Sequence, residues 1–136
     1  MSTLRGPTLD AAQSKRLVLA FLESWRNRDV ELIMSFFTES SVYHNVPVEP
    51  IRGLAGIRAI FEAFLGAFPI ASLDVVSVAA EPGLVIAERL DFFEMSDGTA
   101  FTLPVTGVFE IADEKIVRFS DYFDLASFER KSGMKL

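Results

Sequence analysis

The sequence lacks cysteine and has a single histidine among its 136 residues. Disulfides, thiolate metal sites and cysteine nucleophiles are therefore excluded. One imidazole also leaves little material for a zinc site built on several histidines or for a serine–histidine–aspartate triad. Basic residues are in deficit, because 13 Lys and Arg face 19 Asp and Glu, which gives a formal net charge of −6 at pH 7. This charge argues against binding to nucleic acid or to an anionic membrane surface.

Long hydrophobic runs are missing as well. The apolar run at residues 17–22 is far shorter than the roughly 18 residues that a membrane span needs. The chain starts without the apolar core of a secretory signal, so we expect a cytoplasmic protein. Half of the residues are hydrophobic, which is enough to bury the core of one globular domain over residues 1–136.

Hydrophobic periodicity predicts helices in the first half of the chain. Apolar residues recur at helical spacing over residues 17–25, and Thr8 is placed to cap this helix. A short second helix is expected over residues 32–37, followed by extended chain over 41–46. The clearest helix covers residues 57–68, where apolar side chains recur every third or fourth position until a proline ends the pattern.

The second half of the chain changes to the two-residue period of strands. Extended segments are expected at 72–79, 84–95, 101–111 and 115–123, separated by turn residues, with a short helix over 125–131. This order, in which helices precede hairpin-connected strands, is typical of an α+β protein and not of a parallel βαβ fold.

Alternation along two of the strands places charged side chains among apolar ones. Arg89 and Asp91 share one strand face with valine, alanine and phenylalanine side chains. In the last strand Asp121 also lies among apolar side chains, and alternation assigns Ile116 to the opposite, more polar face. Because an unpaired charge on an apolar face is costly, we expect the Arg89 guanidinium to lie between the two carboxylates.

Such a network has two interpretations. Asp91 and Asp121 would compete for one cation, which would push their pKa values apart and supply one protonated and one ionised carboxyl for acid and base catalysis. Alternatively, the network only organises the sheet, since structural ion networks also perturb pKa values. The pattern by itself leaves both interpretations open.

Another predicted strand carries Tyr43 and Asn45 on one face. Together with the charged residues, this pair resembles the limonene-1,2-epoxide hydrolase family over most of the chain. That family has the nuclear transport factor 2-like fold, a cone in which a strongly curved mixed β-sheet carries the N-terminal helices over its concave face and forms a pocket. The segments that carry the resemblance are Tyr43-x-Asn45, Arg89-x-Asp91, Pro104-Val105-x-Gly107-Val108-Phe109 and Asp121-Tyr122-Phe123-Asp124.

The resemblance implies hydration of a hydrophobic, limonene-type epoxide to a vicinal diol in one step, with no cofactor, no metal ion and no covalent ester intermediate. Asp91 would be the general acid that protonates the epoxide oxygen, and Asp121 the base that takes a proton from water. Arg89 would bridge the two carboxylates, and Tyr43 and Asn45 would hold the attacking water.

Aromatic residues near this set are candidates for the substrate pocket. Phe93, Phe119 and Phe123 share strand faces with the catalytic candidates, so we expect them to line it. Phe119 and Ser120 stand where the family often has Trp and Arg, which leaves the shape of the substrate open. His44 alternates to the opposite face, where a packing or surface role is expected.

The same fold admits other functions. A ketosteroid-isomerase-like or polyketide-cyclase-like enzyme would use a carboxylate to remove a proton beside a carbonyl, and needs no arginine between two aspartates. A module that binds a small ligand without turnover is a further alternative. The largely apolar outer face of the sheet favours a homodimer. Its residues are Leu84, Ile86, Leu90 and Phe92.

Overall fold

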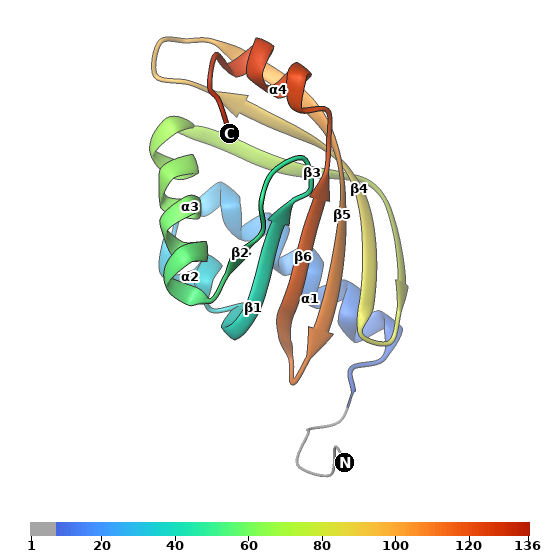
Figure 1. Cartoon of the computed structure of the whole chain (residues 1–136). Helices are drawn as coiled ribbons and strands as arrows, with labels where there is room; N and C mark the ends of the chain where they lie inside the picture. Colours follow the sequence, from blue (N-terminus) through green and yellow to red (C-terminus); the bar gives the residue numbers. More distant parts are fainter. Residues whose placement is uncertain (1–7) are drawn as a thin grey trace.

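The computed structural model describes residues 8–136 and confirms the predicted α+β order (Figure 1). The second helix ends earlier than expected, because the chain turns after Met34 and is extended from Phe37. The elements in chain order are α1 (Ala11–Ser24), the 3-10 turn η1 (Trp25–Asn27), α2 (Val30–Met34), β1 (Phe37–Asn45), β2 (Ile51–Arg52), α3 (Leu54–Ala67), β3 (Ile70–Glu81), β4 (Leu84–Glu94), β5 (Ala100–Ala112), β6 (Lys115–Tyr122) and α4 (Leu125–Ser132).

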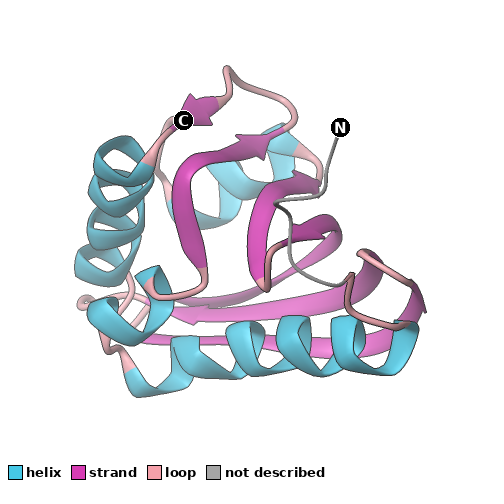
Figure 2. Cartoon of the chain, turned by 90° about the horizontal axis from the view of Figure 1, so that it is seen from below, coloured by secondary structure: helices cyan, strands magenta, loops and turns pink. Residues whose placement is uncertain are grey.

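Within residues 8–136, the strands form one mixed sheet in the order β2-β1-β6-β5-β4-β3. Strands β3 to β6 pair antiparallel with their neighbours, as the sequence predicted, whereas β1 runs parallel to β6. Long strands twist and coil, and Figure 2 shows the resulting strong bend of the sheet with a long helix lying along it. None of the described helices is long and apolar enough to cross a membrane.

The helices bury an aromatic core against the concave face of the sheet. Phe21 of α1 packs edge-on against Phe37 of β1 and Phe119 of β6, with ring centroids 5.3 Å apart in both pairs. Phe61 of α3 meets the Tyr43 ring of β1 at 5.0 Å. Such aromatic pairs contribute about 0.5–1.5 kcal/mol each beyond the area that they bury. This packing fixes the Tyr43 ring in a single position beside the candidate site.

Asp10 caps helix α1, and the prediction that Thr8 caps it was wrong. The Asp10 carboxylate accepts a hydrogen bond from the Gln13 N–H at 2.7 Å, and the Gln13 side-chain oxygen accepts one from the Asp10 N–H at 2.9 Å. This capping box satisfies two backbone donors reciprocally, which explains why the helix starts there.

A β-bulge in β6 overturns the predicted orientation of Ile116. Arg118 pairs with Glu110 and Ile116 pairs with Ile111, so Val117 is an extra residue on β6. Ile116 is consequently fully buried in the core instead of facing the polar side. Strict alternation from the sequence fails here because it takes no account of an inserted residue.

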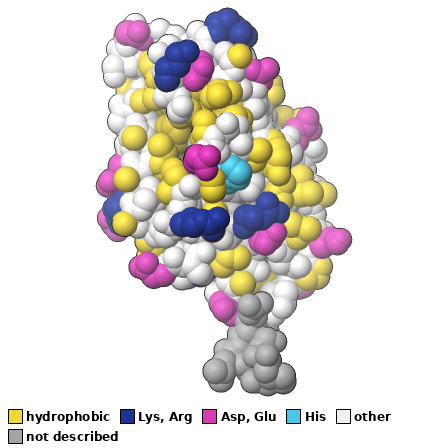
Figure 3. All heavy atoms as spheres, in the orientation of Figure 1, with side chains coloured by type: hydrophobic (Ala, Val, Ile, Leu, Met, Phe, Trp, Pro, Cys, Tyr) yellow, Lys and Arg dark blue, Asp and Glu magenta, His cyan; other side chains and the backbone are white. Residues whose placement is uncertain are grey.

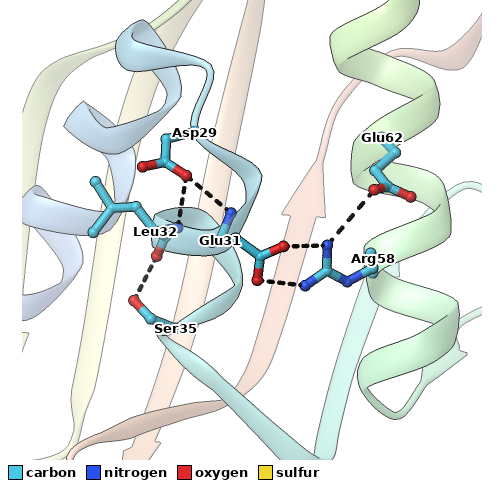
Figure 4. Close-up of polar contacts among 6 residues, drawn as sticks. All are labelled: Asp29, Glu31, Leu32, Ser35, Arg58 and Glu62. Carbon is cyan, nitrogen blue, oxygen red and sulfur yellow. Dashed lines mark hydrogen bonds and ion pairs between the residues drawn. The ribbon is translucent and has the colours of Figure 1, made fainter.

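Polar contacts join α2 to α3 at the edge of the core (Figure 4). The Asp29 carboxylate caps α2 by accepting from the N–H groups of Glu31 and Leu32 at 3.1 and 3.2 Å. Arg58 of α3 then donates two hydrogen bonds, of 2.9 and 2.8 Å, to the Glu31 carboxylate and lies 3.6 Å from Glu62. An exposed pair adds little stability, but the two-point geometry sets the relative orientation of the helices.

Candidate active site

Arg89 lies between two carboxylates and is only 1% exposed. Its guanidinium donates from Nε and Nη2 to Asp91, at 2.9 Å each. From Nη1 and Nη2 it also donates to Asp121, at 2.9 and 3.0 Å. Each carboxylate therefore receives two hydrogen bonds from one planar cation, an arrangement that lysine could not provide. Strand alternation predicted this ion pair network.

Strand β5, which runs between the two carboxylates, carries Gly107 opposite Asp121. A Cβ at Gly107 would lie 2.6 Å from Arg89 Nη1 and 2.9 Å from Asp121 Oδ1. Real Cβ contacts are not that short, so only glycine leaves room for the Arg89 side chain to reach Asp121. Our sequence analysis did not assign Gly107 to the site. The available signal was a glycine inside a strand, which often marks a close approach of another group.

Tyr43 and Asn45 bring a second polar pair to the site. Because β1 runs parallel to β6, Asn45 is in register with Asp121 and Tyr43 with Phe119. The Tyr43 hydroxyl donates to Asn45 Oδ1 at 2.8 Å. The amide oxygen of Asn45 is thereby engaged, which leaves its NH2 group to donate toward the cavity.

Burial and neighbouring charges shift the pKa values of the site. Burial raises the pKa of Asp91 to about 6, opposed by Arg89 and assisted by the charges of Asp121 and Asp74. Burial lowers the pKa of Arg89, but the charges of Asp121 and Asp91 more than offset this and raise it. Burial and the charge of Asp121 raise the pKa of Tyr43 well above its usual range. Near neutral pH, Arg89 is a permanent cation, Tyr43 is a neutral donor and Asp91 is a carboxyl that can carry a proton.

One cavity is lined by all the residues that the sequence analysis assigned to the site. The five polar residues form one part of its wall, and Phe93, Phe119 and Phe123 belong to the apolar part. The catalytic roles of the polar residues stay a prediction. Further lining residues, which the sequence analysis did not assign to the pocket, are Trp25, Phe64, Phe68, Leu73, Leu103, Val105, Phe128 and Leu136.

Trp25 is the most informative of the residues that were missed. Its helical spacing indicated a core residue, and periodicity does not distinguish the core from a pocket wall. The side chain is 6% exposed, and its Nε1 is buried without a hydrogen-bond partner. No other buried side-chain nitrogen or oxygen within residues 8–136 lacks a partner. An unpaired buried N–H costs about 1–3 kcal/mol. Trp25 therefore combines a place in the cavity wall with a buried donor that no described residue pairs with.

The candidate site is built from carboxylates, a guanidinium and an amide. Among the described residues, no group of three or more His, Asp or Glu side chains is arranged to hold a metal ion. His44 lies apart from the cavity lining, with its Nε2 at 2.8 Å from the backbone oxygen of Val48. The arrangement combines a carboxyl that can be protonated with a second carboxylate and an amide donor, which suits general acid and base chemistry.

Comparison with known proteins identifies the family. The model of the SnoaL-like domain matches residues 18–119, and the chain belongs to this family. Its fold is the nuclear transport factor 2-like α+β fold that the sequence predicted.

Individual relatives include epoxide hydrolases. Epoxide hydrolase EphG of Mycobacterium tuberculosis is 28% identical over 108 residues, which cover 79% of this chain and 71% of that protein. The structure of an LEH-like epoxide hydrolase of M. tuberculosis matches with a TM-score of 0.78 and 26% identity, over 89% of this chain and 90% of the other. A putative polyketide cyclase from Xanthomonas campestris pv. campestris matches with a TM-score of 0.80 and 19% identity, over 90% and 98% of the two chains. At that identity the cyclase shows a shared fold alone.

Proposed function

We propose that this protein hydrates a hydrophobic, limonene-type epoxide in one step to give a vicinal diol. The observation that carries the proposal is the Arg89 guanidinium bonded to both Asp91 and Asp121. Asn45, in register with Asp121, adds a donor at the same place. Similarity to an epoxide hydrolase, found both by sequence and by structure, supports this chemistry.

Asp91 serves as the general acid. Burial raises its pKa to about 6, so a proton is available near neutral pH. As the C–O bond of the epoxide breaks, the epoxide oxygen takes this proton and leaves as a hydroxyl instead of an alkoxide. Asp91 becomes a carboxylate in the same step, and its two hydrogen bonds from Arg89 stabilise that charge.

Asp121 serves as the general base. A water molecule that accepts a hydrogen bond from the Asn45 amide and donates one to Asp121 keeps a lone pair for the epoxide carbon. Its oxygen forms the new C–O bond while Asp121 takes one of its protons. One carboxyl loses a proton as the other gains one, so the charge of the site is unchanged. A proton then has to return to Asp91 before the next turnover.

The test is product analysis in ¹⁸O-labelled water with the enzyme in excess of the epoxide. Limonene-1,2-epoxide and a panel of cyclic and aryl epoxides are the substrates, and Asp121→Asn is the control variant. Direct attack by water predicts label in the diol of the first turnover. Unlabelled first-turnover diol would show that a carboxylate oxygen had been transferred through an ester. Absence of diol from every epoxide would contradict the proposal and favour proton transfer beside a carbonyl, or ligand binding without turnover.

We further propose that the protein is a homodimer that pairs through the outer face of the sheet. Figure 3 shows hydrophobic side chains gathered on the face turned to the viewer. Ile86, Leu90, Val76 and Tyr122 are each between 43% and 58% exposed, whereas Leu84 and Phe92 are half-buried. An exposed apolar patch of this kind is typical of a surface that pairs with a partner.

A further inference from the structure

Residues from the segment after β6 line the cavity on the side of Phe68 and Phe93. Phe128 of α4 and Leu136 both line it. Leu136 and Met134 also pack against the buried cluster that includes Phe68 and Leu103. Figure 1 shows α4 above the sheet, with the following segment turning back beneath the helix. Segment 133–136 therefore contributes to the wall of the site, although it belongs to no helix or strand.

The reversal of the chain occurs at Gly133. This residue has φ 74°, a left-handed conformation that favours glycine, and its N–H donates to the Glu129 backbone oxygen at 2.8 Å. The Met134 N–H then donates to Ser132 Oγ at 3.0 Å. The turn ends α4 and directs the next residues back along the helix toward the cavity.

The Glu129 side chain holds the returning segment. Its Oε2 accepts from the Leu136 N–H at 3.4 Å, and its Oε1 lies 3.3 Å from Lys135 Nζ. The Lys135 side chain is 84% exposed, so this ion pair adds little stability. The Leu136 side chain is half-buried against apolar neighbours. Position 136 is thus held by apolar packing and by one carboxylate.

We propose that Leu136 limits the length of substrate that the cavity accepts, and that Glu129 is the positioning residue that keeps it there. A substrate whose oxygen lies at Asp91 extends its hydrocarbon part along the apolar wall toward Phe128 and Leu136. Additional methylenes then meet the Leu136 side chain, which has to be displaced. That the substrate is an epoxide rests on the proposed function. That Leu136 forms part of the cavity wall does not depend on it.

The wall is tested without any substrate through the fluorescence of Trp25, the single tryptophan of the sequence. Trp25 lines the same cavity and is 6% exposed. In Leu136→Ala, acrylamide should quench this tryptophan more strongly than in the wild type. Lys135→Ala is the matched control, because it alters an exposed neighbour and should leave quenching unchanged. Equal quenching in the wild type and Leu136→Ala would overturn the proposed wall.

Selection by length is tested by comparing kcat/KM for 1,2-epoxydecane and 1,2-epoxyhexane. Leu136→Ala should raise the ratio of the long to the short substrate by about ten-fold, and Leu136→Phe should lower it. Glu129→Ala should shift the ratio in the same direction as Leu136→Ala, whereas Lys135→Ala should not. An unchanged ratio in both Leu136 variants, with thermal unfolding like that of the wild type, would overturn the selection. If no epoxide reacts but quenching responds as expected, the wall is supported and the proposed function fails.

Discussion

Gly107 of β5 lies directly opposite Asp121 of β6, and the Arg89 guanidinium occupies the space where a side chain at position 107 would be. Strand β5, between the strands that carry the two carboxylates, thus contributes no side chain at position 107, and this absence leaves space. This vacancy lets a buried cation on β4 reach a carboxylate two strands away.

Gly107→Ala should therefore damage the site more than its size suggests. The new methyl group would force Arg89 and Asp121 apart, and misplacement by about 1 Å costs roughly 10²-fold in rate. Overpacking should also lower the free energy of unfolding by about 1–3 kcal/mol. Diol formation and urea unfolding are the measurements.

The matched control is Gly66→Ala in α3, where nothing lies within 4 Å of the added Cβ. Gly66 lies in the last turn of α3 and has no left-handed φ, so alanine should stabilise the protein by roughly 0.4–1 kcal/mol through the unfolded chain and leave turnover unchanged. Full activity in Gly107→Ala would show that Arg89 does not need this space.

Asp91→Asn and Asp121→Asn should each lower kcat by about 10²- to 10⁴-fold, because one proton transfer is lost in each variant. The fold should persist, since Arg89 keeps one charged partner in either case. Asp97→Asn is the control, because this carboxylate is exposed in the turn between β4 and β5, where it accepts from the Thr99 N–H at 2.9 Å. Appreciable activity in Asp91→Asn or Asp121→Asn would remove the assigned role from that residue.

The rate should fall as pH rises through about 6, because Asp91 must be protonated to act as the acid and its pKa is raised to about 6. The titration of Asp91 should also make the free energy of unfolding depend on pH. The native state retains the Asp91 proton between pH 3.8, its ordinary pKa, and about 6, while the unfolded state has lost it. Native protein then binds more protons, so the contribution of Asp91 to the unfolding free energy decreases as pH rises through this window.

Urea unfolding of the wild type and Asp91→Asn at a series of pH values measures this contribution. The wild type should lose stability relative to the variant between about pH 4 and 6. A difference that stays constant across this window would contradict the raised pKa.

Tyr43→Phe should reduce kcat by about ten-fold with little change in KM, because it removes the hydroxyl that orients Asn45 at 2.8 Å. The ring should stay in place through its contacts with Phe61 and Phe119, both at 5.0 Å. Tyr122→Phe, on the outer face and 48% exposed, changes the same chemical group away from the site. Equal kcat values for the two variants would exclude Tyr43 from positioning water.

Leu90→Glu should convert the proposed homodimer into a monomer, because it places a charge in the middle of the exposed apolar patch, at a residue that is 45% exposed. Light scattering coupled to gel filtration measures the mass. Leu32→Glu alters a similarly exposed leucine on α2 and should leave the mass unchanged. A monomeric wild-type protein would contradict the dimer.

The sequence by itself determined the features that depend on near neighbours along the chain. Arg89 and Asp91 share a face because side chains two apart on a regular strand point the same way, and β4 pairs with β5 without a register shift. The helix at α3 follows from apolar residues every third or fourth position. Local rules failed where a single residue changed the pattern, at the bulge that turns Ile116 inward and at the Asp10 cap.

Only the tertiary structure decided which distant segments meet. The parallel pairing of β1 with β6 sets Asn45 in register with Asp121, the space at Gly107 admits Arg89, and the turn at Gly133 brings Leu136 to the cavity. The strand pairing and the space at Gly107 depend on residues far apart in the chain, and so does the packing of Leu136 against Phe68 and Leu103. Alternation and helical periodicity report only which way a side chain faces within its own element, so they do not contain the register of one strand against another or the shape of the cavity between them.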